Sequence, residues 1–132
     1  MPTYTSYYAN RAVYGRDAII VPVSNSYPKG LVPGGTMPSC IPPWKGIVVP
    51  YKDGLISKEE YRIRYISFLN GNKENIIREY TMLKNRSEGK DIILLCYEKD
   101  GDFCHRHILA KWLSEKTGDK ITPLKDNQQV LF

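Results

Sequence analysis

The sequence predicts an α/β protein: a three-layer sandwich of the Rossmann-like type, with a mainly parallel central sheet and one domain spanning residues 1–132. Short apolar runs at 18–23 and 92–95 have the length of strands and are bounded by turn residues. Segments with helical periodicity alternate with these runs. A chain of 132 residues with 42% hydrophobic residues is long enough for one core but not two.

The first half of the chain supplies two of the strands. Residues 4–8 are rich in strand-forming side chains and predict the first strand, followed by a polar connector at 10–16. Residues 18–23 predict the second strand, although Pro22 weakens this prediction because proline cannot donate a ladder hydrogen bond and prefers a sheet edge or a strand end. Residues 28–43 are dense in Pro and Gly and predict a long irregular loop, of the kind that often serves as a lid or binding loop.

Two helices should follow the loop. Ser57 and Glu60 have the spacing of a capping box, so a helix is expected to begin there and to end at Asn70-Gly71. A second helix is expected around the apolar residues at 76–83, with its end near Gly89.

The most informative stretch is residues 92–113. The apolar run at 92–95 predicts a strand buried on both faces, and residues 108–113 continue as an amphipathic helix. Asp102 is the expected N-cap of that helix and Gly118 its expected end. Residues 120–124 predict a last edge strand, and residues 127–132 a tail.

The polar residues that follow these strands predict a binding site. In parallel α/β sheets, ligands bind outside the carboxyl ends of the strands. Small polar groups are expected at that edge from three separate segments: Thr5 and Ser6, Ser24 and Asn25, and Cys96 and Glu98.

The beginning of the last helix carries the reactive side chains. Helical spacing directs His105 toward the sheet, Cys104 and Arg106 to the flanks, and His107 outward. A cation is disfavoured at a helix N-terminus, so Arg106 needs a negative group nearby. Either acidic neighbours such as Glu98 supply it, or the helix start and Arg106 hold a phosphate or carboxylate.

Three kinds of chemistry are open at this site. His105 and Glu98 form a candidate proton-transfer pair, although Glu98 as the ion-pair partner of Arg106 is the favoured alternative. Cys104 is a candidate nucleophile, although a packing role is favoured over it. No metal or cofactor is expected. Zinc bound by Cys96, Cys104, His105 and His107 is the minor alternative, because their spacing is not that of paired ligands.

Composition adds broad limits. The chain has 19 Lys and Arg against 14 Asp and Glu, a net charge of +5 that suits a phosphate-bearing partner but does not require one. Three cysteines and no secretion signal suggest a reduced cytoplasmic protein without a disulfide framework. No apolar run is long enough to span a membrane.

The central motif also carries a family resemblance. The apolar strand, Cys96, Glu98 and the Cys104-His105-Arg106 sequence that opens a helix resemble the family catalogued as domain of unknown function 488. Residues 4–7 and 24–28 are similar to that family as well. The resemblance implies a small bacterial or phage α/β protein with these five motif residues and no assigned reaction.

Three functions remain open, and they belong to different classes. The first is binding of a phosphate-bearing ligand, a nucleotide or a nucleic-acid end, with hydrolase or transferase chemistry as an extension. The second is a non-catalytic module that binds nucleic acid or a partner protein through its basic surface and ten tyrosines. The third is a thiol-based enzyme that uses Cys104.

Overall fold

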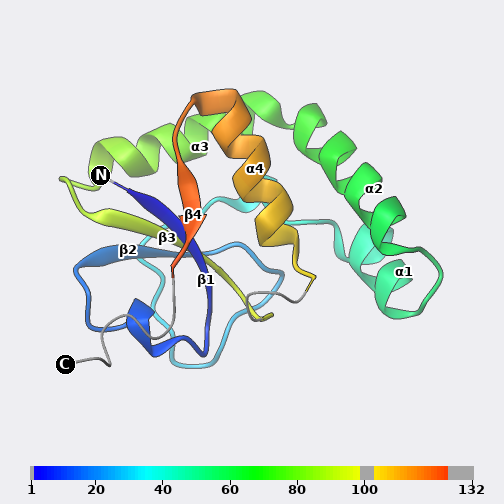
Figure 1. Ribbon diagram of the computed structural model, residues 1–132, viewed down its shortest axis with the longest axis horizontal. Coiled ribbons are helices and arrows are strands. Elements are labelled where there is room, and N and C mark those ends of the chain that lie inside the picture. Colours follow the sequence, from blue (N-terminus) through cyan, green and yellow to red (C-terminus); the bar gives the residue numbers. More distant parts are fainter. Residues whose placement is uncertain (1, 99–102, 125–132) are drawn as a thin grey trace.

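The expected α/β sandwich with a parallel sheet is confirmed by a computed structural model, which describes residues 2–98 and 103–124 (Figure 1). The sheet has the order β2-β3-β1-β4, with β1 at Thr3–Tyr7, β2 at Ala18–Pro22, β3 at Asp91–Cys96 and β4 at Ile121–Pro123. All three strand pairs are parallel. Pro22 and Pro123 lie in the two outer strands, as expected, where a missing backbone donor interrupts no ladder.

The helices cover one face of the sheet (Figure 1). They are the short α1 (Val49–Lys52), α2 (Lys58–Gly71), α3 (Lys73–Arg86) and α4 (His105–Thr117). The other face is covered by irregular segments around the 3-10 turn η1 (Arg11–Val13) and Leu124. Consecutive residues of β3 alternate between these two cores, with Ile92 and Leu94 toward the helices and Ile93 and Leu95 toward η1. The continuous apolar run is therefore buried on both faces.

Capping explains where the main helices begin and end. The Ser57 Oγ accepts the backbone N–H of Glu60 at 3.1 Å, which confirms the predicted start of α2. Gly118 adopts the left-handed conformation that ends α4, with φ of +80°. The N-cap of α4 is Cys104, whereas Asp102, the expected cap, lies outside the described residues.

The Pro/Gly segment is bound to the rest of the fold along its length. The Gly34 N–H donates to the Ile20 carbonyl at 2.8 Å, and Arg86 of α3 donates to the Gly34 carbonyl. Further along, the Ser39 hydroxyl donates to the Glu79 carboxylate. The segment includes a 3-10 turn η2 (Pro38–Cys40) and leads into a π-helical turn η3 (Trp44–Val48) that continues as α1, neither of which the sequence predicted. Among the described residues, no helix combines the length and apolar character that crossing a membrane requires.

The contact of Gly35 with α3 makes a testable prediction. A Cβ at Gly35 would collide with Leu83 Cδ2 of α3, whereas a Cβ at Gly46 would meet only Pro43 Cβ at 3.7 Å. Gly35→Ala should lower the free energy of unfolding by about 1–3 kcal/mol through overpacking. Gly46→Ala is the matched control and should leave stability unchanged or raise it. Equal urea midpoints for the two variants would contradict this packing.

Candidate functional site

A half-open cavity of about 180 Å³ lies beyond the carboxyl ends of β2 and β3, as the parallel sheet predicts. Residues after β2 and β3 form one side, and η3, α1, α2 and the start of α4 form the others. The lining residues are Ser24, Asn25, Ser26, Trp44, Val48, Tyr51, Lys52, Tyr61, Tyr97, Glu98, Phe103, Cys104 and His105.

Aromatic rings make up much of this lining. The ring centroids of Tyr51, Tyr61 and Phe103 lie 5.1–5.3 Å from one another. Trp44 remains 48% exposed and Tyr97 50% exposed. Tyr61 meets both other rings edge-to-face, and the three rings form an apolar surface against which another flat ring can pack.

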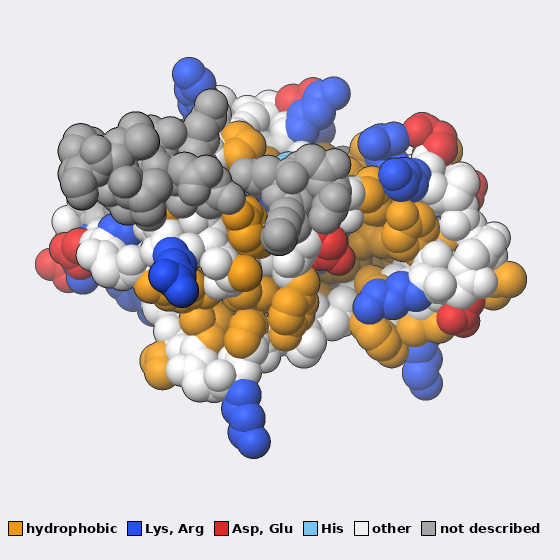
Figure 2. All heavy atoms as spheres, turned by 60° about the horizontal axis from the view of Figure 1, so that its bottom comes forward, with side chains coloured by type: hydrophobic (Ala, Val, Ile, Leu, Met, Phe, Trp, Pro, Cys, Tyr) orange, Lys and Arg blue, Asp and Glu red, His pale blue; other side chains and the backbone are white. Residues whose placement is uncertain are grey.

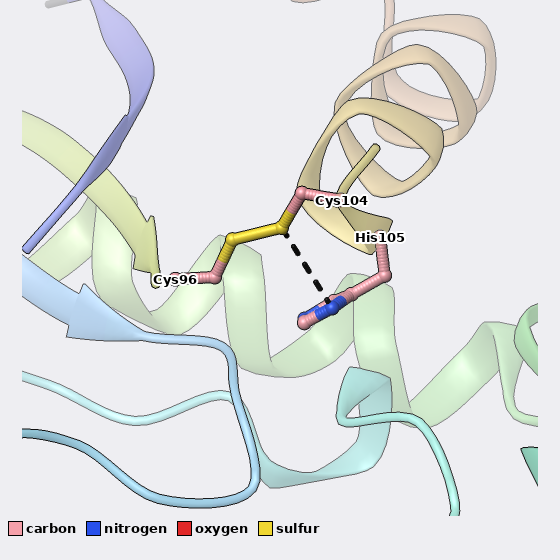
Figure 3. A group of neighbouring side chains, drawn as sticks. All are labelled: Cys96, Cys104 and His105. Carbon is pink, nitrogen blue, oxygen red and sulfur yellow. Dashed lines mark hydrogen bonds between the residues drawn. A yellow bond between two sulfur atoms is a disulfide. The ribbon is translucent and has the colours of Figure 1, made fainter. Parts of the chain in front are cut away.

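His105 is held in one tautomer. Its Nε2 lies 2.5 Å from the carbonyl oxygen of Val23, so Nε2 carries the proton and donates. Nδ1 is then the lone-pair nitrogen, and it faces Cys104 Sγ at 4.0 Å (Figure 3). Burial lowers the pKa of His105 from 6.5 to about 4, with a further lowering from Arg106 and His107. The ring is therefore neutral at pH 7 and can accept a proton or bind a metal through Nδ1.

The expectation of unpaired cysteines is wrong, because a disulfide joins Cys96 at the end of β3 to Cys104 (Figure 3). The eight-residue separation of the two cysteines does not by itself indicate a disulfide, and the pairing follows from how α4 packs against the end of β3. The third cysteine, Cys40, is a buried free thiol. Cys96, Cys104 and His105 thus form one compact cluster beside the cavity.

Arg106 is fully buried and does not line the cavity. The sequence had instead predicted a position on the flank of the helix, where Arg106 could hold an anion. Its Nη1 donates to Cys96 Sγ at 2.9 Å and to the main-chain oxygen of Glu98. Its guanidinium also lies over the Tyr7 ring. The helix packs so closely on the ends of β1 and β3 that this side chain is enclosed between them. The geometry makes Arg106 a positioning residue for the β3–α4 connection.

These motif residues lie within a stretch that matches a known family. Residues 35–117 match the family model DUF488-N3a, described as the active DUF488-N3 subclade. The chain belongs to the DUF488 family. The family resemblance inferred from the sequence is thereby confirmed, and the Cys96, Glu98 and Cys104-His105-Arg106 residues lie within the matched stretch. No curated protein and no solved structure is similar enough to match the chain.

Glu98 of the DUF488 motif reaches the cavity with its side chain. Glu98 is one of the lining residues, and its carboxylate Oε2 lies 3.6 Å from Cys96 Sγ. Among the described contacts, Arg106 meets Glu98 through the main-chain oxygen rather than the carboxylate. Burial raises the pKa of the neighbouring Tyr61 hydroxyl, and the Glu98 charge raises it further.

The other predicted ligand-binding residues divide into two groups. Ser24 and Asn25 line the cavity, where the Ser24 hydroxyl lies 2.6 Å from the Tyr8 hydroxyl and Asn25 donates to the Pro42 carbonyl. Thr5 and Ser6 do not line it, because they lie within β1 and are buried, with the Ser6 Oγ accepting from Asn10 at 2.8 Å. Residues of η3 and α1 line the side of the cavity where the β1 residues Thr5 and Ser6 were expected.

Sequence reasoning missed Trp44, Tyr51 and Lys52 as cavity residues. The signal was a tryptophan directly after Pro42-Pro43, at the end of a long loop that returns toward the sheet. Tyr61 of α2 packs in the hydrophobic core and also borders the cavity.

The lowered pKa of His105 predicts an acid-sensitive fold. Between pH 6.5 and 4 the unfolded chain binds a proton that the folded protein excludes, so stability falls as the pH drops through this range. The loss should be roughly 3 kcal/mol, and stability should be independent of this group above pH 6.5. Urea titrations of the oxidised protein at several pH values measure it. His105→Gln should flatten the profile and His107→Gln should not; an unchanged slope in His105→Gln would refute the assignment.

Proposed function

We propose that this DUF488 protein binds a phosphate-bearing ligand with a planar ring, a nucleotide or a nucleic-acid end, in the aromatic cavity. The observation that carries the proposal is the ring-lined cavity that adjoins the first residue of a helix. Hydrolase or transferase chemistry on that ligand is the extension that Glu98 and His105 make available. The description of the family names no reaction.

The cavity suits one flat ring system. Its volume of about 180 Å³ is below the roughly 300–1,000 Å³ typical of pockets for drug-sized ligands. A ring would be enclosed, and the rest of the ligand would lie at the open side. Aromatic side chains accept any nucleobase by stacking, so the walls favour the class without choosing one base.

Two groups support an anion at the open side. Helix α4 has 13 residues, and the side chain of its N-cap residue, Cys104, does not cap the first turn. Backbone N–H groups at that end attract negative charge. Lys52 adds a cation to the cavity lining. Hydrophobic side chains gather in a hollow with Lys and Arg side chains near its rim, seen when the lower side of Figure 1 is turned forward (Figure 2).

Proton transfer would fall to Glu98 and His105. Both line the cavity, and the neutral His105 ring has its Nδ1 lone pair on the side of Cys104. A carboxylate and a neutral imidazole each keep a free lone pair at neutral pH, so both can act as proton acceptors. Arg106 would contribute indirectly by fixing the main chain of Glu98.

Tryptophan fluorescence tests ligand binding directly. Trp44 lines the cavity, whereas Trp112 is buried and donates to Asn70 outside it. Titration with nucleoside monophosphates should quench Trp44 emission. Trp44→Ala should weaken binding about 5- to 100-fold, the range expected for one lost stacking contact.

Trp44→Phe keeps a ring and is the matched control, which should bind nearly as wild type when measured by calorimetry. Affinity should fall only modestly with salt, because one pocket engages few phosphates. A steep salt dependence with no effect of Trp44→Ala would favour the non-catalytic nucleic-acid module instead. Absence of binding across the nucleotides would contradict the proposal.

A second candidate, a thiol-based enzyme that uses Cys104, is favoured by one contact. His105 Nδ1 lies 4.0 Å from Cys104 Sγ, on the side where it can accept the thiol proton. The helix N-terminus beside Cys104 also favours a thiolate. This activity needs the reduced pair and therefore a reducing compartment, the cytoplasm.

Alkylation distinguishes this candidate. After reduction and desalting, Cys104 should react with iodoacetamide at mildly acidic pH at least about tenfold faster than Cys40, whose buried thiol has a raised pKa. The Cys104 rate should drop in His105→Gln. A Cys104 no more reactive than Cys40, measured by peptide mass spectrometry, would eliminate the candidate.

A further inference from the structure

We propose that Cys96, Cys104 and His105, once the disulfide is reduced, form a binding site for a zinc ion. The three residues come from the end of β3, the N-cap of α4 and its first helical residue (Figure 3). The site does not depend on the ligand proposed above, since it is built from the chain's own side chains.

The donor atoms are already close enough. One ligand atom from each of the three residues lies within 4.8 Å of the others. Zinc binds sulfur at about 2.3 Å and nitrogen at about 2.0–2.1 Å, so tetrahedral donor atoms lie roughly 3.5–3.8 Å apart. The Cys104 Sγ to His105 Nδ1 distance is 4.0 Å. The cysteine Cα atoms are 7.5 Å apart, which leaves the two sulfurs room to separate by side-chain rotation.

His105 has the orientation of a metal ligand. Metal-binding histidines usually donate their other ring N–H to a carbonyl or carboxylate, which fixes the tautomer. His105 makes such a bond from Nε2 to the Val23 carbonyl at 2.5 Å. Nδ1 therefore presents a lone pair to the sulfur atoms.

Arg106 favours negative charge on the cluster. Its Nη1 donates to Cys96 Sγ at 2.9 Å while the side chain is fully buried. A guanidinium at this distance stabilises a thiolate more than a thiol, and thiolates are the form that binds zinc. Two thiolates and one neutral imidazole would cancel the charge of the ion.

The donor set indicates both the metal and an open position. Two thiolates and an imidazole select zinc over the harder magnesium and calcium ions. Cys104 and His105 also line the cavity, and the Glu98 carboxylate lies 3.6 Å from Cys96 Sγ. Three protein ligands with the fourth position facing a cavity is the arrangement of zinc sites that admit water or a ligand. His107 is not part of the set, because it borders a different surface hollow beside Arg62 and Glu115.

Redox state controls access to the site. A phosphine reductant gives the disulfide two electrons and breaks the S–S bond, and one water molecule supplies both the oxygen of the resulting phosphine oxide and the two protons that complete the thiols. Zinc then displaces the thiol protons and binds both sulfurs. The disulfide and the metal use the same two sulfur atoms, so they exclude each other.

The test uses the full chain, reduced with a phosphine under anaerobic conditions. Competition with a chromophoric chelator should show one zinc bound per chain, and the oxidised protein should bind none at that affinity. Cobalt(II) in place of zinc should give thiolate-to-metal charge-transfer absorption. Cys96→Ser and Cys104→Ser each remove a ligand, so each should lower zinc affinity by more than the roughly 10- to 100-fold that loss of an outer-shell partner costs. Cys40→Ser, which alters the remaining cysteine, should bind as wild type.

Absence of the thiolate–cobalt absorption in the reduced wild-type protein would overturn the proposal, whatever the variants do. So would wild-type zinc affinity in the double variant of Cys96 and Cys104. Circular dichroism of each variant separates loss of ligands from loss of fold. If a serine variant unfolds, the wild-type cobalt spectrum and the comparison of reduced with oxidised protein still decide the outcome.

Discussion

The hydrogen bond from His105 to the Val23 carbonyl joins the start of α4 to the chain that leaves β2. These segments are 82 positions apart, and β3 lies between β2 and β1 in the sheet. This one bond fixes the ring tautomer, places Nδ1 against the cysteine pair and closes one wall of the cavity. The ring is buried, so without this bond the Nε2 proton would have no hydrogen-bond acceptor.

Arg106 also fixes the position of the start of α4, through contacts with β3. It connects the sulfur of Cys96 and the main chain at Glu98 to α4, so a buried charge holds the end of β3 against the start of the helix. Such groups destabilise a fold when they lose their partners, and they limit the geometries that the chain can adopt. The DUF488 motif can be understood in these terms: cysteine, histidine and arginine act on one another before any ligand is present.

The sequence predicted the parts of the fold that depend on local pattern. The Ile92–Leu95 run, the Ser57 cap and Gly118 each act through near neighbours, and each element formed as expected. The site was predicted less well. Cys96 and Cys104 are bonded, and Arg106 is enclosed, because of how α4 packs on the strand ends. Trp44 and Tyr51 reach the cavity only through the path of the Pro/Gly segment, which no periodicity encodes.

The course of that segment has a consequence for association. β2 is an outer strand, and its free side would otherwise offer backbone donors and acceptors to any extended chain. Gly34 occupies one of these groups, the Ile20 carbonyl, and its own carbonyl is taken by Arg86. The segment thus blocks strand addition by a second molecule at this point. A few glycine and proline residues, instead of a further strand, protect the apolar β2 from aggregation.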